Sequence, residues 1–179
     1  MLLAGEVVLI FPDEHAPRGE RRMHLKPNQF VYYPAGFAHT LRTTSESPAN
    51  YLMFKWHGDE TGIVSPMSFG QYDALPPAQM PGSRDGFCPQ LVFEGPTAYL
   101  RKLHCHTSTL APGAGYDPHS DPYDVAVIVL EGEVETLGER VGPCGVIFYC
   151  AGDPHGMRNP GETASRYLVF EFQGGRGET

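Results

Sequence analysis

The amino-acid sequence contains an internal repeat, and no other feature limits the possible folds so strongly. When the chain is aligned with itself at an offset of 116 residues, residues 35–58 fall on residues 151–174 without a gap. Nine of these 24 positions are identical, and they combine turn glycines, a histidine and apolar residues of a strand. Shared composition explains such a combination poorly, so the sequence predicts two copies of one supersecondary unit.

Both copies follow the same order of segments. An apolar run comes first, at 30–33 and again at 146–149, and it is followed by an Ala-Gly turn and then a histidine. After a polar turn, each copy continues with another strand-like segment, at 51–56 and at 167–172. Short strands punctuated by Gly and Pro are typical of a sandwich or barrel. The chain has 21 Gly and 17 Pro and no long helical period, so we predict an all-β protein.

The two copies differ at their beginnings. At least three strand-like segments precede Gly132 in the second copy, and the first copy has no counterpart for them before Gly5. The Gly-Glu-Val sequences that start at these two glycines match at an offset of 127 rather than 116. The first copy therefore carries eleven additional residues, which we place in a charged hairpin loop at 12–23.

An incomplete first repeat would expose sheet edges and half of a core. Three explanations stay open: a partner chain covers the gap, which predicts a homodimer; residues 62–95 fold back to fill it; or the natural protein begins upstream of Met1. The predicted organisation is an incomplete repeat over 1–60, a linker over 61–88 and a second repeat over 89–179.

Charge and hydropathy exclude two classes of partner. The formal net charge of −8 argues against nucleic acid, because phosphate binding requires a basic surface. The longest apolar stretches, such as 125–130, are too short to span a bilayer, and Glu6 interrupts the apolar start of the chain. The four cysteines show no CxxC spacing, which favours reduced thiols and a cytoplasmic location.

Three segments resemble the two sequence motifs of the cupin superfamily. Residues 115–132, which read GYDPHSDPYDVAVIVLEG, resemble the first motif. Residues 145–159, which read GVIFYCAGDPHGMRN, resemble the second motif, and residues 29–39 match the second motif again. The resemblance implies a bicupin: two tandem double-stranded β-helices, or jelly-roll barrels, of which the first is truncated. It implies no single activity, because this fold hosts many functions.

The resemblance also implies a metal ion inside the barrel, held by two histidines and a carboxylate from the first motif and a histidine from the second. His119 and His155 match the first and last of these ligands. The second histidine position holds Asp121, and the glutamate position holds Val125. The remaining set has the composition of a 2-His-1-carboxylate site. We expect His119, Asp121 and His155 to hold a divalent ion such as Fe, Mn, Ni or Zn.

Strand periodicity is consistent with this ligand set. Residues at i and i+2 share one face of a strand, so His119 and Asp121 can point inward together. The same alternation turns Tyr123 inward and Asp124 outward, unless a β-bulge reverses it and offers Asp124 as a fourth ligand. In the first repeat, His39 has no HxH partner upstream. We expect His39 to have a packing role.

Two residues are candidates for proton transfer beside the ion. Tyr123 is predicted to face the site, where a phenol can donate or accept a proton. His106 alternates with Leu103 and Cys105 on a predicted strand that also carries His104. Either the two histidines or their neighbours face the barrel interior, and the sequence leaves this choice open.

Two functions from different classes fit this sequence. The first is a metal-dependent enzyme of oxygenase, isomerase, lyase or hydrolase type that acts on a small polar molecule. The second is a non-catalytic cupin that binds a small molecule, or serves a structural role, and has lost its metal. The degraded ligand set and the incomplete first repeat favour the second function, whereas the retained Asp121 favours the first.

Overall fold

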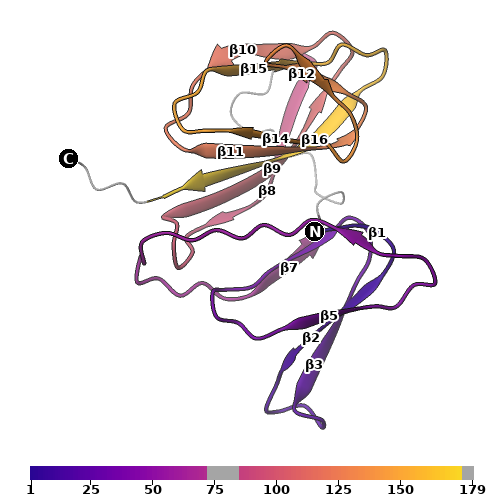
Figure 1. Ribbon diagram of the computed structural model, residues 1–179, viewed down its shortest axis with the longest axis vertical. Helices are drawn as coiled ribbons and strands as arrows, with labels where there is room; N and C mark the ends of the chain where they lie inside the picture. Colours follow the sequence, from indigo (N-terminus) through magenta and orange to yellow (C-terminus); the bar gives the residue numbers. More distant parts are fainter. Residues whose placement is uncertain (72–84, 175–179) are drawn as a thin grey trace. The chain divides into compact units, whose positions relative to one another are not determined.

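The computed structural model describes residues 1–71 and 85–174 (Figure 1). Every regular element in these two ranges is a β-strand, which confirms the predicted all-β class. The strands form five separate sheets, and none of these sheets closes on itself. No helix that could span a membrane occurs in the described part of the chain.

The chain divides into two compact units. Among the described residues, the first unit comprises 1–57 and 64–71, and the second comprises 58–63 and 85–174. The predicted linker over 61–88 stays a prediction, and its central part lies outside the described residues. A strand of four residues, Ser68–Gln71, falls within the predicted linker.

The first unit contains three small sheets around an apolar core. Its strands are β1 (Leu2–Ala4), β2 (Val7–Pro12), β3 (Glu20–Leu25), β4 (Gln29–Tyr32), β5 (Thr40–Thr43), β6 (Asn50–Tyr51) and β7 (Ser68–Gln71). The sheets have the strand orders β3-β2-β5, β1-β6 and β4-β7. Alternate residues of β2 point into the core, where Val7, Leu9 and Phe11 pack with Leu2 and Leu25.

The second unit contains two larger sheets. Its strands are β8 (Phe87–Gly95), β9 (Lys102–Leu110), β10 (Gly115–His119), β11 (Asp124–Glu131), β12 (Val134–Thr136), β13 (Glu139–Val141), β14 (Val146–Tyr149), β15 (His155–Arg158) and β16 (Ser165–Gln173). One sheet has the order β14-β11-β16-β9-β8, and the other has the order β10-β15-β12-β13. The predicted inward face of β11 is confirmed, because Val125, Val127 and Val129 lie in the core.

The repeat in the sequence is also a repeat of strand pairing. In the first unit, β2 pairs with both β3 and β5. In the second unit, β12 pairs in the same way with β13 and β15. The partners Leu2 and Tyr51 of the first unit correspond to the partners Val129 and Tyr167 of the second. Equivalent residues therefore meet equivalent partners in both units.

Two differences between the units modify the sequence-based picture. The eleven additional residues do not all form a loop, because β2 and β3 have six residues each and pair continuously from Val7 and Leu25 to Pro12 and Glu20. Strand β7 pairs with β4, the position that β11 takes beside β14 in the second unit. One explanation left open by the sequence was that residues 62–95 fold back onto the first repeat. Within that segment, residues 68–71 do form a strand that pairs with the first repeat.

Glycine is required at the turn that opens each hairpin. Gly5 and Gly132 both have positive φ angles, of 75° and 67°. A Cβ atom at Gly132 would lie 2.8 Å from the carbonyl oxygen of Ala164 and 2.9 Å from the Cα of Ser165. Left-handed backbone is unfavourable for residues with a side chain, and here the backbone of a neighbouring segment also occupies the space.

We therefore expect Gly132→Ala to lower the free energy of unfolding by roughly 1–3 kcal/mol, since it adds steric overlap to an unfavourable φ angle. The matched control is Gly138→Ala, because Gly138 has a φ of 82° and a Cβ atom there would meet nothing within 4 Å. Thermal or urea unfolding followed by circular dichroism measures both. Equal destabilisation by the two substitutions would contradict the role of crowding at Gly132.

Candidate metal centre

Two paired strands of the second unit bring His119 and His155 together. Strands β10 and β15 are antiparallel, and their register places His119 opposite His155 after an irregularity that follows Tyr116. Asp121 follows β10 in the turn that leads to β11. Its backbone carbonyl accepts a hydrogen bond of 2.7 Å from the amide of Gly152. The three predicted ligands are therefore neighbours, although His155 is far from the other two in sequence.

The side chains of these three residues converge on one carboxylate oxygen. Oδ2 of Asp121 lies 3.6 Å from Nε2 of His119 and 3.4 Å from Nε2 of His155. The other ring nitrogens face backbone carbonyls: Nδ1 of His119 is 3.4 Å from the oxygen of Asp117, and Nδ1 of His155 is 2.9 Å from the oxygen of Asp153. A carbonyl only accepts hydrogen bonds, so each Nδ1 carries the proton.

This arrangement suits a divalent cation. In the neutral rings, protonation at Nδ1 leaves a lone pair on each Nε2, and both lone pairs lie beside the Asp121 carboxylate. Metal-bound histidines characteristically donate their second ring N–H to a carbonyl or carboxylate, as these two do. The His155 side chain is 4% exposed and that of His119 is 48% exposed. The donor set is thus anchored on one side and open on the other.

A stacked tyrosine holds the His155 ring. The ring of Tyr149 lies parallel to that of His155, with an interplanar angle of 10° and centroids 4.0 Å apart. Oγ1 of Thr136 donates to the carbonyl of Gly156 at 2.7 Å, so its single hydrogen is used there. The Tyr149 hydroxyl, also 2.7 Å from Oγ1 of Thr136, is consequently the donor in that bond. These contacts limit the rotation of the His155 ring.

The three residues line a cavity of about 700 Å³ in the second unit. Such a volume is in the usual range for pockets that hold small molecules. The side chains of Val125, Val127 and Val169 form an apolar part of its wall. Charged and histidine side chains form the polar part. The cavity can therefore hold a small molecule against the His119, Asp121 and His155 group.

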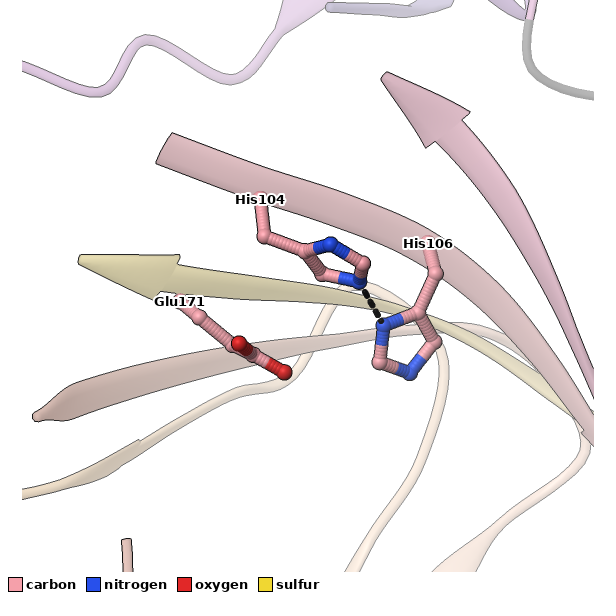
Figure 2. A group of neighbouring side chains, drawn as sticks. All are labelled: His104, His106 and Glu171. Carbon is pink, nitrogen blue, oxygen red and sulfur yellow. Dashed lines mark hydrogen bonds between the residues drawn. The ribbon is translucent and has the colours of Figure 1, made fainter. Parts of the chain in front are cut away.

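A second polar group lines the same cavity (Figure 2). His104 and His106 of β9 face inward, together with Glu171 of β16, which pairs with His104. Nδ1 of His104 lies 2.9 Å from Oε2 of Glu94, and its Nε2 lies 2.9 Å from Nδ1 of His106. The choice that the sequence left open for this strand is settled: the histidines, and not Leu103 and Cys105, line the cavity.

Tyr123 lies near carboxylates of both groups, namely Glu171 and Asp121. Burial, followed by the negative charges of these two carboxylates, raises the pKa of Tyr123 above its usual value. The phenol therefore stays protonated at neutral pH. It is suited to donating a hydrogen bond and not to acting as a general base at that pH.

Asp124 does not belong to the site. Its carboxylate accepts a hydrogen bond of 2.9 Å from the amide of Ala151, and the residue is exposed. The bulge that would have turned Asp124 inward is not formed, since β11 pairs regularly with β14 from Val125 to Ile128. In the first unit, the ring of His39 contacts that of Tyr33, with centroids 3.7 Å apart and an interplanar angle of 43°.

No protein-family model matches the sequence, and no curated protein matches it either. Solved structures do match. A structure from Pseudomonas aeruginosa described as a glyoxylate induced protein aligns with 100% of this chain and 67% of its own, at 14% identity and a TM-score of 0.69. The Bacillus subtilis oxalate decarboxylase, described with Mn(II) centers, aligns with 98% of this chain at 12% identity and a TM-score of 0.63.

Both of these structures are cupin jelly rolls. The chain has the cupin fold. At such low identities the likeness concerns the fold alone, and the chain spans only 63% of the length of the decarboxylase. The predicted cupin fold is thus confirmed, although none of the described sheets closes on itself.

Sequence reasoning missed two carboxylates that line the cavity. Glu171 and Glu94 lie outside the recognised motifs, and only the alternation of their strands carried a signal. On β16, Tyr167 and Val169 face the core, so period-2 alternation turns Glu171 to the same side. Glu94 of β8 pairs with His104 across the ladder. The pairing of β8 with β9, which places Glu94 beside His104, was not evident from the sequence.

The buried position of His106 predicts a pH dependence of stability. Burial, followed by the neighbouring His104, lowers the pKa of His106 from 6.5 to about 4. Between these pH values the unfolded chain binds a proton at this residue and the folded chain does not. The free energy of unfolding of the metal-free protein should therefore fall as the pH decreases from about 6.5 to 4, by on the order of 3 kcal/mol from this group.

Urea unfolding of wild type and His106→Gln across this pH range tests that expectation. The variant should lose stability less steeply with acidification than wild type. His15→Gln is the matched control, because His15 is exposed and should leave the slope unchanged. Parallel curves for wild type and His106→Gln would show that His106 titrates normally in the folded protein.

Proposed function

We propose that this chain is a metal-dependent cupin that binds one divalent ion through His119, Asp121 and His155 and acts on a small polar molecule in the adjoining cavity. One observation carries this proposal: two Nε2 atoms approach a single carboxylate oxygen at 3.6 and 3.4 Å while both Nδ1 atoms are engaged by backbone carbonyls. This donor set suits Fe, Mn, Ni or Zn.

The size and the lining of the cavity suit a small substrate. A volume of about 700 Å³ admits a molecule of metabolite size, and the apolar valines exclude water from one side of it. The polar wall offers hydrogen bonds to a carboxylate, hydroxyl or carbonyl group. A bound divalent ion with open positions would polarise such a group or activate water.

Tyr123 is the chain's own candidate for moving a proton in this reaction. Its hydroxyl lies near the carboxylate of Asp121 and stays protonated at neutral pH. His106 is the second candidate, because its ring lines the cavity and its lowered pKa keeps it neutral. Substitution of Tyr123 should affect turnover more than metal binding.

The test is the metal content of purified chain. After treatment with a chelator and dialysis against Mn²⁺, we expect His119→Ala or His155→Ala to weaken binding at this site at least 10-fold, because each removes a ligand. Mn²⁺ is a suitable probe because Cys88, Cys144 and Cys150 are exposed, and thiolates prefer softer ions. Elemental analysis and electron paramagnetic resonance of unbound Mn²⁺ give the stoichiometry.

His39→Ala is the matched control, since His39 occupies the equivalent place in the first repeat and lacks neighbouring ligands from its own repeat. It should leave binding unchanged. If the His119 and His155 variants bind Mn²⁺ as wild type does, the proposal is wrong. Metal-dependent turnover of small carboxylic acids that is lost in Tyr123→Phe with metal retained would support catalysis.

A further inference from the structure

The histidine pair of β9 has a geometry that the first site does not explain. Nε2 of His104 and Nδ1 of His106 are 2.9 Å apart, and the ligand atoms of these residues and of Glu171 all lie within 4.8 Å of one another (Figure 2). Two neutral imidazole nitrogens approach so closely only when a proton or a cation lies between them. Adjacent ligands of one ion, at bonds of about 2.0–2.2 Å, are separated by roughly 3 Å.

A hydrogen bond to Glu94 orients the His104 ring as a metal ligand. Oε2 of Glu94 lies 2.9 Å from Nδ1 of His104. A carboxylate oxygen accepts hydrogen bonds, so Nδ1 of His104 carries the proton and Nε2 presents a lone pair to the cavity. Carboxylate–histidine pairs of this kind commonly support metal ligands.

Glu171 supplies negative charge with no cation beside it. Within 1–71 and 85–174, the partners of its carboxylate are the amide of Gln173, at 2.9 Å, and the phenol of Tyr123. Neither partner is charged. Its neighbours His104 and His106 are ligating residue types at the same end of the sheet. A divalent ion would neutralise Glu171 and take the place of the proton between the two rings.

We propose that His104, His106 and Glu171 form a second divalent-metal site in the same cavity, oriented by Glu94. His106 binds the ion through Nδ1 and carries its own proton on Nε2, so that the ring stays neutral and only changes tautomer. Tyr123 lies near a carboxylate ligand of each site, Asp121 in the first and Glu171 in the second. This assignment goes beyond the proposed function, does not depend on it, and gives His106 a ligand role in place of proton transfer.

Mn²⁺ binding by the full chain separates the two sites. Wild type should bind about two equivalents, and Glu171→Gln or His106→Gln should bind about one. The double variant His119→Ala/His155→Ala should also retain about one equivalent, because the second site is intact. Adding Glu171→Gln to that double variant should abolish binding. His15→Gln serves as the surface control, and circular dichroism verifies that each variant is folded.

Each outcome decides one proposal. If Glu171→Gln and His106→Gln bind as much Mn²⁺ as wild type, the second site does not exist and the histidine pair is a hydrogen-bonded pair. Suppose that wild type and His119→Ala/His155→Ala each bind one equivalent, and that Glu171→Gln and His106→Gln bind none. The second site then stands and the proposed function is wrong. Loss of all binding in the His119→Ala/His155→Ala variant overturns the second site.

Glu94→Gln gives an independent readout of the orienting role. Removing the carboxylate that fixes the His104 tautomer should weaken Mn²⁺ at the second site by roughly 10- to 100-fold. The affinity of the first site should not change. Nitrogen chemical shifts of the imidazole rings should also show that Zn²⁺, added to Mn²⁺-free protein, moves the His106 proton from Nδ1 to Nε2. A His106 spectrum that Zn²⁺ leaves unchanged, together with unaltered affinities in Glu94→Gln, would contradict the assignment.

Discussion

The alternation of side chains on β9, β11 and β16 determines where the second unit is apolar and where it is polar. The interior face is apolar along β11 and along most of β16, where Glu171 follows Tyr167 and Val169, whereas on β9 it carries His104 and His106 and ends at Leu110. The antiparallel register then places these polar residues together, with Glu171 opposite His104 on one neighbour and opposite Val125 on the other. Asp121 and Tyr123 precede β11 at this same end. The His104, His106 and Glu171 group depends on this matching of register, whereas the pairing of β10 with β15 brings His119 and His155 together.

Comparison with the first unit shows which contacts of the His155 side chain are shared by both repeats. His39 faces the carbonyl of Phe37 with Nδ1 at 2.8 Å, as His155 faces that of Asp153 at 2.9 Å. Tyr33 contacts His39 at a tilt of 43°, whereas the equivalent Tyr149 stacks on His155 at 10°. The orientation of the histidine is therefore built into both units. What distinguishes the second unit is β10 and the turn after it, which add ligands that have no counterpart in the first.

Tyr123 lies near carboxylates of both candidate groups, Glu171 and Asp121. Burial, followed by the charges of these carboxylates, raises the pKa of its hydroxyl, which stays protonated at neutral pH. A carboxylate that is held by a hydrogen-bond donor loses rotational freedom and is better prepared to bind a cation. The surrounding valines lower the local polarity, which strengthens each of these interactions. The arrangement favours cations over anions at this end of the cavity.

The sequence by itself determined the repeat, the β class, the cupin likeness and the grouping of His119, Asp121 and His155. These follow from short-range rules, namely the period of two in strands, the need for glycine where φ is positive, and motif spacing. Only the tertiary structure decided that His104 and His106 face the cavity, that Glu171 and Glu94 join them, and that Asp124 does not. Strand periodicity leaves two faces equally possible, and the packing of β9 between β8 and β16 selects one of them. Contacts between distant strands depend on register, which no local pattern in this chain specifies.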